Sequence, residues 1–229
     1  MEKILDEIND AWFYNQDISK MNIENLVERF CKQQIKSGNN AGMFYVPETD
    51  YKIGLRLFTG EKLKTKLATR NIFGQEATRL LRLSNISTEE VQTIIEKADR
   101  WMLKSCYAAD YCFIGECAHS AIGFMRYLAV AETKNTEQQL IKYIELIRKR
   151  RDGKGKWKGL PFHYTLLTLL EVNNLLAIDE LRYALPAIER SLKRTNNNDK
   201  FSQRRRDVMK RVLDTLEIRS PSNLRIKLG

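Results

Sequence analysis

The only two histidines of the chain, His119 and His163, occupy matching positions in two apolar segments. Each follows a glycine by four residues, Gly115 in the first case and Gly159 in the second. Near neutral pH an imidazole can act as a general acid or base, or orient a ligand. Glu116, three residues before His119, would add a carboxylate on a neighbouring stripe of the same helix. The commoner role, a buried and hydrogen-bonded structural histidine, stays open for both residues.

The four cysteines, Cys31, Cys106, Cys112 and Cys117, are expected to be reduced and buried as small apolar side chains. Cys112 and Cys117 together with His119 are similar to part of a metal site. No CxxC pair is present, and the spacing matches no common zinc motif. We therefore expect no metal site, and no motif identifies a cofactor.

The elements that must position these residues are expected to be helices. Gly74, Gly115 and Gly159 each open an apolar segment, and their spacings of 41 and 44 residues are typical of helical-hairpin repeats. Residues 113–131 and 162–172 are apolar on almost every face, which predicts inner helices that are buried all round. Segments with one apolar stripe alternate with them and predict outer helices: residues 89–102, 140–147 and 181–192.

The predicted fold class is therefore all-α. We expect an array of antiparallel helix pairs in inner and outer layers, either an α/α superhelix or an incomplete α/α toroid. The chain is predicted to be a single domain over residues 1–229. Within it we expect N-terminal helices and an irregular connection (1–67), the helical-hairpin repeats (68–217) and a C-terminal tail (218–229).

This layered arrangement of paired helices resembles the α/α toroids of terpenoid cyclases and protein prenyltransferases. Residues 152–162 resemble the turns with Gly and Trp that lead into inner helices in those proteins, and the resemblance covers roughly residues 68–217. The aspartate-rich motif of the cyclases is absent, as is a recognisable Asp/Cys/His zinc-ligand set. About nine helices would leave the usual ring of twelve open. The resemblance thus implies a fold and no activity.

Composition is typical of one soluble globular chain, with 43% hydrophobic and 30% charged residues among 229. The first residues show no basic stretch followed by an apolar one, so we expect no secretory signal. No apolar run approaches the length of a membrane span. We expect a cytoplasmic protein, and nothing in the sequence indicates its oligomeric state.

The net charge of +10 is unevenly distributed. It gathers in three basic clusters, each just before an inner or terminal helix: Lys62, Lys64, Lys66 and Arg70; Arg148, Lys149, Arg150, Arg151, Lys154, Lys156 and Lys158; and Lys193, Arg194, Lys200, Arg204, Arg205 and Arg206. In a hairpin array these clusters would share one rim and attract anions, aided by the helix N-termini. The alternative is that they only complement helix dipoles and keep the surface soluble.

The sequence predicts most directly a protein that binds or acts on an anionic small molecule in a concave centre beside the basic rim. Its expected ligand-binding residues are His119, His163, Glu116, Arg70 and Trp157. A first alternative is a nucleic-acid binder similar to the HEAT-repeat DNA glycosylases, and a second is a protein-interaction scaffold. For Trp157, core packing is the alternative to stacking on a ligand. No motif decides whether the protein is an enzyme.

Overall fold

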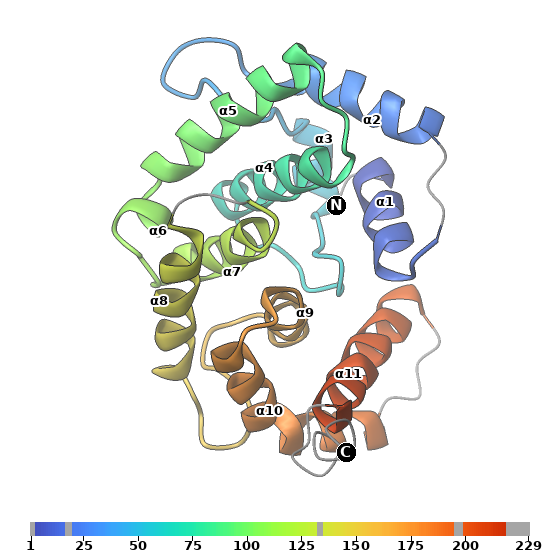
Figure 1. The fold of residues 1–229 in the computed structure, drawn as a ribbon, viewed down its shortest axis with the longest axis vertical. Coiled ribbons are helices and arrows are strands. Elements are labelled where there is room, and N and C mark those ends of the chain that lie inside the picture. Colours follow the sequence, from blue (N-terminus) through green and yellow to red (C-terminus); the bar gives the residue numbers. More distant parts are fainter. Residues whose placement is uncertain (1–2, 17–19, 132–134, 195–198, 219–229) are drawn as a thin grey trace, which may run out of the picture. The chain divides into compact units, whose positions relative to one another are not determined.

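The computed structural model describes residues 3–16, 20–131, 135–194 and 199–218, and this part of the chain is helical (Figure 1). It contains eleven α-helices and no strand, which confirms the all-α prediction for the described residues. Three isolated bridges between extended residues are the only β-type pairings found there. None of the helices in the described part has the length and apolar character needed to cross a membrane.

The contacts between Cα atoms divide the chain into two compact units, which are described separately. The N-terminal unit comprises residues 1–136 and the C-terminal unit residues 137–229. The single-domain prediction and its internal divisions stay predictions.

The N-terminal unit contains seven helices among its described residues: α1 (Lys3–Phe13), α2 (Lys20–Gln33), α3 (Glu48–Ile53), α4 (Lys66–Leu83), α5 (Glu89–Lys104), α6 (Cys106–Ala109) and α7 (Glu116–Leu128). Its core centres on α4 and α7, which lie against each other (Figure 1). Every residue from 71 to 81 of α4 and from 120 to 128 of α7 is buried. The predicted burial of the apolar segment 113–131 is therefore confirmed along most of α7.

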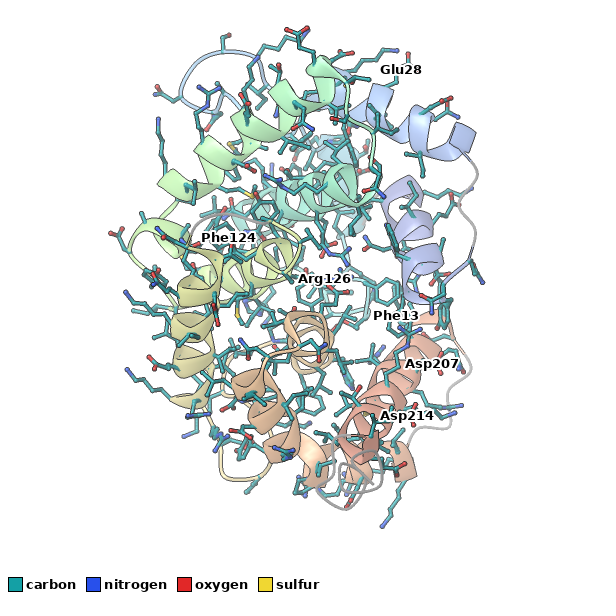
Figure 2. The ribbon with its side chains drawn as sticks, in the orientation of Figure 1. Phe13, Glu28, Phe124, Arg126, Asp207 and Asp214 are labelled. Carbon is teal, nitrogen blue, oxygen red and sulfur yellow. The ribbon has the colours of Figure 1, made fainter. Side chains whose placement is uncertain are left out.

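Polar side chains join α4 to α7 inside this core. Arg126 donates a hydrogen bond of 2.7 Å to the carboxylate of Glu76, and both side chains are almost completely buried (Figure 2). Gln75 donates to the backbone carbonyl of Ser120 at 3.0 Å, and Asn71 donates to the Ser120 hydroxyl at 3.1 Å. From Asn71 to Glu76 along α4, the partners on α7 proceed from Ser120 to Arg126. The two helices therefore run in the same direction. We call this set of contacts the α4–α7 seam.

The seam depends on a close approach of the two helices at Gly123. A Cβ atom at this position would lie 2.3 Å from the Gln75 amide oxygen and 3.4 Å from the Ile72 side chain. Only a glycine lets α7 come this near to α4 without displacing the Gln75 side chain. A sequence with a larger residue there would separate the hydrogen-bonding partners of the seam.

The helix starts differ in part from those predicted. Gly74 lies inside α4, which begins eight residues earlier at Lys66, so the prediction that Gly74 opens a helix was wrong. The signal at the true start is Thr65, whose side chain accepts a hydrogen bond of 3.2 Å from the Ala68 N–H. Gly115 does precede α7 directly, and its φ of 53° is one that side chains with a Cβ rarely adopt.

The C-terminal unit contains four helices among its described residues: α8 (Thr136–Arg148), α9 (Phe162–Val172), α10 (Leu175–Arg194) and α11 (Lys200–Ile218). Residues 164–169 of α9 are buried, and α10 and α11 both pack on this helix. The amphipathic pattern of residues 181–192 corresponds to α10, which buries Leu181, Ala184 and Ile188. The apolar segment 162–172, predicted to be an inner helix, corresponds to α9.

The buried ion pair of the seam gives a test of the N-terminal unit. Replacing Arg126 with Met should lower the free energy of unfolding by about 3–5 kcal/mol, because the Glu76 carboxylate stays buried without its cation. The double variant Glu76→Leu/Arg126→Met should recover part of this loss, since no charge is then buried. Unfolding in urea followed by circular dichroism measures both.

A matched control is Lys32→Met in the pair that Lys32 forms with Glu28, whose side chains are 72% and 64% exposed. This variant should leave the unfolding midpoint unchanged. If Arg126→Met also left it unchanged, the ion pair would not contribute to the fold.

Candidate functional site

The five predicted ligand-binding residues lie in different units. Arg70, Glu116 and His119 belong to the N-terminal unit, whereas Trp157 and His163 belong to the C-terminal unit. Whether the two histidines border one cavity stays a prediction. The two groups of residues are considered in turn.

The N-terminal ends of α4 and α7 meet at a hydrogen bond between side chains. The Thr65 hydroxyl, at the start of α4, donates to the carboxylate of Glu116 in the first turn of α7. A carboxylate at a helix N-terminus also complements the helix dipole. Glu116 therefore has a structural role that joins the two helix starts.

His119 is half-buried in the first turn of α7. Burial lowers the pKa of its imidazole from the ordinary value, and the nearby positive charge of Lys64 acts in the same direction. The carbonyl of Gly115 and the charge of Glu116 oppose this shift without cancelling it. The shift favours the neutral imidazole, in which one ring nitrogen is a donor and the other an acceptor.

Arg70 lies on α4, about one turn from its start. Its Nε is buried and has no hydrogen-bond partner among the described residues. Burial raises the pKa of the Tyr51 hydroxyl, and the positive charges of Arg70 and Lys66 partly offset that rise. Arg70 is thus close enough to Tyr51 for its charge to act there.

A small pocket lies between α3 and the start of α4, and we call it the α3–α4 pocket. Its volume is about 270 Å³. Tyr51, Lys52, Lys64 and Lys66 contribute to its wall, together with Glu48. Lys66 forms an ion pair of 2.6 Å with Glu48 and lies 5.4 Å from the centre of the Tyr51 ring. With three lysines and one glutamate, the charge of this wall is positive.

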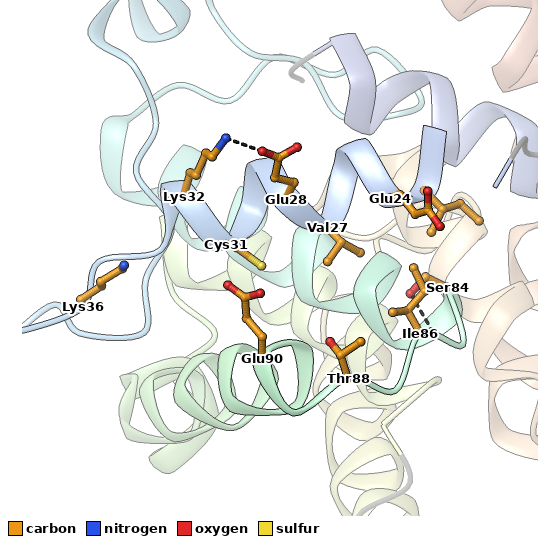
Figure 3. A pocket seen from close by; sticks show the side chains of 11 residues that line it. Glu24, Val27, Glu28, Cys31, Lys32, Lys36, Ser84, Ile86, Thr88 and Glu90 are labelled. Atoms are coloured by element: carbon orange, nitrogen blue, oxygen red, sulfur yellow. Dashed lines mark hydrogen bonds and ion pairs between the residues drawn. The ribbon is translucent and has the colours of Figure 1, made fainter. Parts of the chain in front are cut away.

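A second pocket of the N-terminal unit has the opposite character (Figure 3). It has a volume of about 700 Å³ and lies between α2 and the segment that joins α4 to α5. Three carboxylates line it, those of Glu24, Glu28 and Glu90, against two lysines, Lys32 and Lys36, so its wall carries one net negative charge. Burial and the neighbouring Glu90 raise the pKa of Cys31 in its wall to about 11, so the thiol stays protonated at neutral pH. This pocket therefore favours neither an anion nor a thiolate nucleophile.

Trp157 lies in the core of the C-terminal unit, where it donates to Glu180. Its indole Nε1 is 3.0 Å from the Glu180 carboxylate, and only 3% of the residue is exposed. Glu180 is fully buried and also accepts hydrogen bonds from Arg151, at 2.9 and 3.1 Å, and from Arg148, at 3.0 Å. Two cations of the second basic cluster are thereby paired inside the unit, and we call this group the Glu180 cluster.

The turn before α9 is held by Asp152. Its carboxylate accepts hydrogen bonds from the backbone N–H groups of Lys154 and Lys156, at 2.7 and 2.9 Å, and from the Tyr183 hydroxyl at 3.1 Å. The two backbone donors are the main reason that the pKa of Asp152 is lowered. This stretch is an ordered connection.

His163 is half-buried in the first turn of α9, with its ring edge-on to Phe162 at 5.1 Å between centroids. It is the second residue of α9, whereas His119 is the fourth residue of α7. Each histidine follows its glycine by four residues in sequence, but the two histidines occupy different positions within their helices. Ligand binding by His163 stays a prediction.

Sequence reasoning missed Glu180 and Tyr51. A signal for Glu180 was present, because it occupies the apolar stripe of α10 beside Ala177, Leu181 and Ala184, and a carboxylate there needs buried partners. Tyr51 lies on the short helix α3, within the region 1–67 for which the sequence predicts helices and an irregular connection without locating them.

Comparison of the chain with family models, curated proteins and solved structures finds no match. The function is therefore argued from the geometry of the chain alone.

The Glu180 cluster gives a test of the role of Trp157. Trp157→Phe removes the indole N–H and leaves the buried carboxylate with one donor fewer, which should lower the free energy of unfolding by about 1–3 kcal/mol. Trp12→Phe on α1, where the side chain is 39% exposed, is the matched control and should have a smaller effect. Equal stability of Trp157→Phe and the wild type, in urea unfolding, would contradict a structural role.

Proposed function

We propose that this protein binds a small anionic molecule in the α3–α4 pocket of its N-terminal unit. The observation that carries the proposal is the positive wall of this pocket, to which three lysines and one glutamate contribute. Arg70 does not line the pocket, but its charge acts on Tyr51, which does. An anionic oxygen in the pocket would be attracted by these charges and, after a rotation of the Arg70 side chain, would form a charge-assisted hydrogen bond with its guanidinium.

The surroundings of Arg70 support the same ligand class. Lys52, Lys64 and Lys66 line the pocket, and the N-terminus of the 18-residue helix α4 adds its partial positive charge. Of these cations Lys66 is already paired with Glu48, so Lys52 and Lys64 are the more available ones.

The size of the pocket limits the ligand. Its volume of about 270 Å³ lies just below the range of roughly 300–1,000 Å³ usual for sites of drug-sized ligands. A phosphate, a sulfate or a small carboxylate suits it better than a nucleotide. His119, half-buried beyond Lys64, is proposed as a polar neighbour of this site, with Glu116 holding the helix start.

The other functions considered from the sequence, nucleic-acid binding and protein interaction, have less support than anion binding. Nucleic-acid binding is less supported, because Arg148 and Arg151 are paired with Glu180 and the side chain of Arg204 in the third cluster is buried. Neither a protein-interaction surface nor an enzymatic activity has a specific observation in its favour.

We also propose how the helices are arranged. In this proposal they form an array of antiparallel pairs, resembling an incomplete α/α toroid. The same direction of the two buried helices α4 and α7 supports it, as does α5, which buries one face. A cytoplasmic location is proposed as well, and the four free cysteines are compatible with a reducing compartment.

Arg70→Gln tests the proposed site. Titration of the wild type with inorganic phosphate or sulfate, followed by calorimetry, should give one binding event. The variant should bind at least about tenfold more weakly, because a hydrogen bond to a charged group contributes roughly 1.5–3 kcal/mol.

Arg100→Gln is the matched control, since Arg100 is exposed on α5 and distant in sequence from the pocket. It should bind like the wild type. If Arg70→Gln and Arg100→Gln bound these anions equally well, or if the wild type bound none of them, the proposed site would be wrong. A short duplex titrated in the same buffer tests the nucleic-acid alternative, whose affinity should fall steeply with salt.

A further inference from the structure

Three of the four cysteines meet at one place in the N-terminal unit. The sulfur atoms of Cys106, Cys112 and Cys117 all lie within 4.8 Å of one another. The sulfur atoms of Cys106 and Cys117 are 3.4 Å apart. The sequence predicts no metal site because Cys112 and Cys117 match no zinc spacing. Cys106 is the thiol which that reasoning left out.

The turn between α6 and α7 brings these thiols together. Cys106 begins α6, and the backbone N–H of Cys112 returns to donate to the Cys106 carbonyl at 3.0 Å. Tyr111, just before Cys112, has a φ of 51°, which is unusual for a residue with a side chain and reverses the chain there. Cys117 then follows in the first turn of α7.

We propose that Cys106, Cys112 and Cys117 form a binding site for a thiophilic metal ion, with Zn²⁺ as the first candidate and Cu⁺ as the second. Thiolates are the preferred ligands of both ions. The proposal is independent of anion binding at the α3–α4 pocket.

The separations of the sulfur atoms fit such an ion. Three thiolates bound to zinc at about 2.3 Å in tetrahedral directions lie about 3.8 Å from one another. The observed values, 3.4 Å for one pair and no more than 4.8 Å for the others, bracket this distance. Small side-chain rotations are therefore enough to bring all three sulfurs to one ion.

The proposed site has three protein ligands among the described residues, and one of them is open to solvent. Cys106 is exposed, whereas Cys112 and Cys117 are half-buried. Water or an added ligand can therefore complete a tetrahedral zinc site, and a three-coordinate Cu⁺ needs no fourth ligand. Glu116 does not supply it, because its carboxylate is held by Thr65.

Other roles of the three thiols fit the geometry less well. Packing as small apolar side chains does not explain Cys106, which is exposed. A disulfide between Cys106 and Cys117 would use two of the three thiols and leave Cys112 beside them without a role.

Metal titration of the full chain tests the proposal. The protein is first treated with a chelator and a phosphine reductant, then titrated anaerobically with Co²⁺ as a spectroscopic probe for Zn²⁺, and in a second series with Cu⁺. One equivalent should bind, with a thiolate-to-cobalt charge-transfer band that Zn²⁺ abolishes. Cys106→Ser and Cys112→Ser should each bind at least about tenfold more weakly, because even the loss of an outer-shell partner weakens metal sites roughly 10- to 100-fold.

Cys31→Ser is the matched control, since this cysteine lies in the wall of the second pocket and away from the cluster. It should bind like the wild type. Cys106→Ser replaces an exposed side chain and should keep its circular dichroism spectrum, so a loss of binding is separable from unfolding. The proposal is overturned if the reduced wild type retains neither metal after desalting, or if Cys106→Ser and Cys31→Ser bind equally.

Discussion

Two charges that are almost completely removed from water, those of Glu76 and Arg126, determine how α4 and α7 meet. Burying either charge alone would cost several kcal/mol, so the two helices are stable only in the register that pairs them. Gly123 permits the close approach that this register needs, because a Cβ atom there would strike Gln75. The ion pair therefore selects one register of the two helices more than it adds to the free energy of unfolding. Most of that free energy comes from the burial of apolar side chains.

The chemistry of the N-terminal unit is located at one end of that seam. Because α4 and α7 run in the same direction, their starts lie together, joined by Thr65 and Glu116. Two kinds of ligand group gather there. The cationic group, the lysines of the α3–α4 pocket, suits an anion. The thiol group at the start of α7 suits a thiophilic cation. A shift of one helix along the other would displace both groups.

The helices themselves follow from local patterns, and for that reason the sequence predicts them well. The stripe of residues 89–102 corresponds to α5, and the all-round apolar segment to α7. The errors arise where distant residues decide the outcome. Gly74 is explained by its neighbours Phe44 and Trp101 inside the core, not by a helix start. Arg70 and His119 were predicted from charge and spacing, and their role in a site stays a prediction. Cys106 was not singled out, because its approach to Cys117 depends on a left-handed Tyr111 that no local pattern signals.

The central claim is that the α4–α7 seam is the most stable part of the N-terminal unit and opens as one piece. Native-state hydrogen exchange of the full chain, resolved by peptide, measures this directly. The seam predicts that the amides of residues 71–78 and 120–126 exchange most slowly in the unit and at a common rate, because opening either helix exposes the paired charges of both. Faster exchange of one segment than the other by about tenfold or more, a difference of roughly 1.4 kcal/mol in opening free energy, would contradict it.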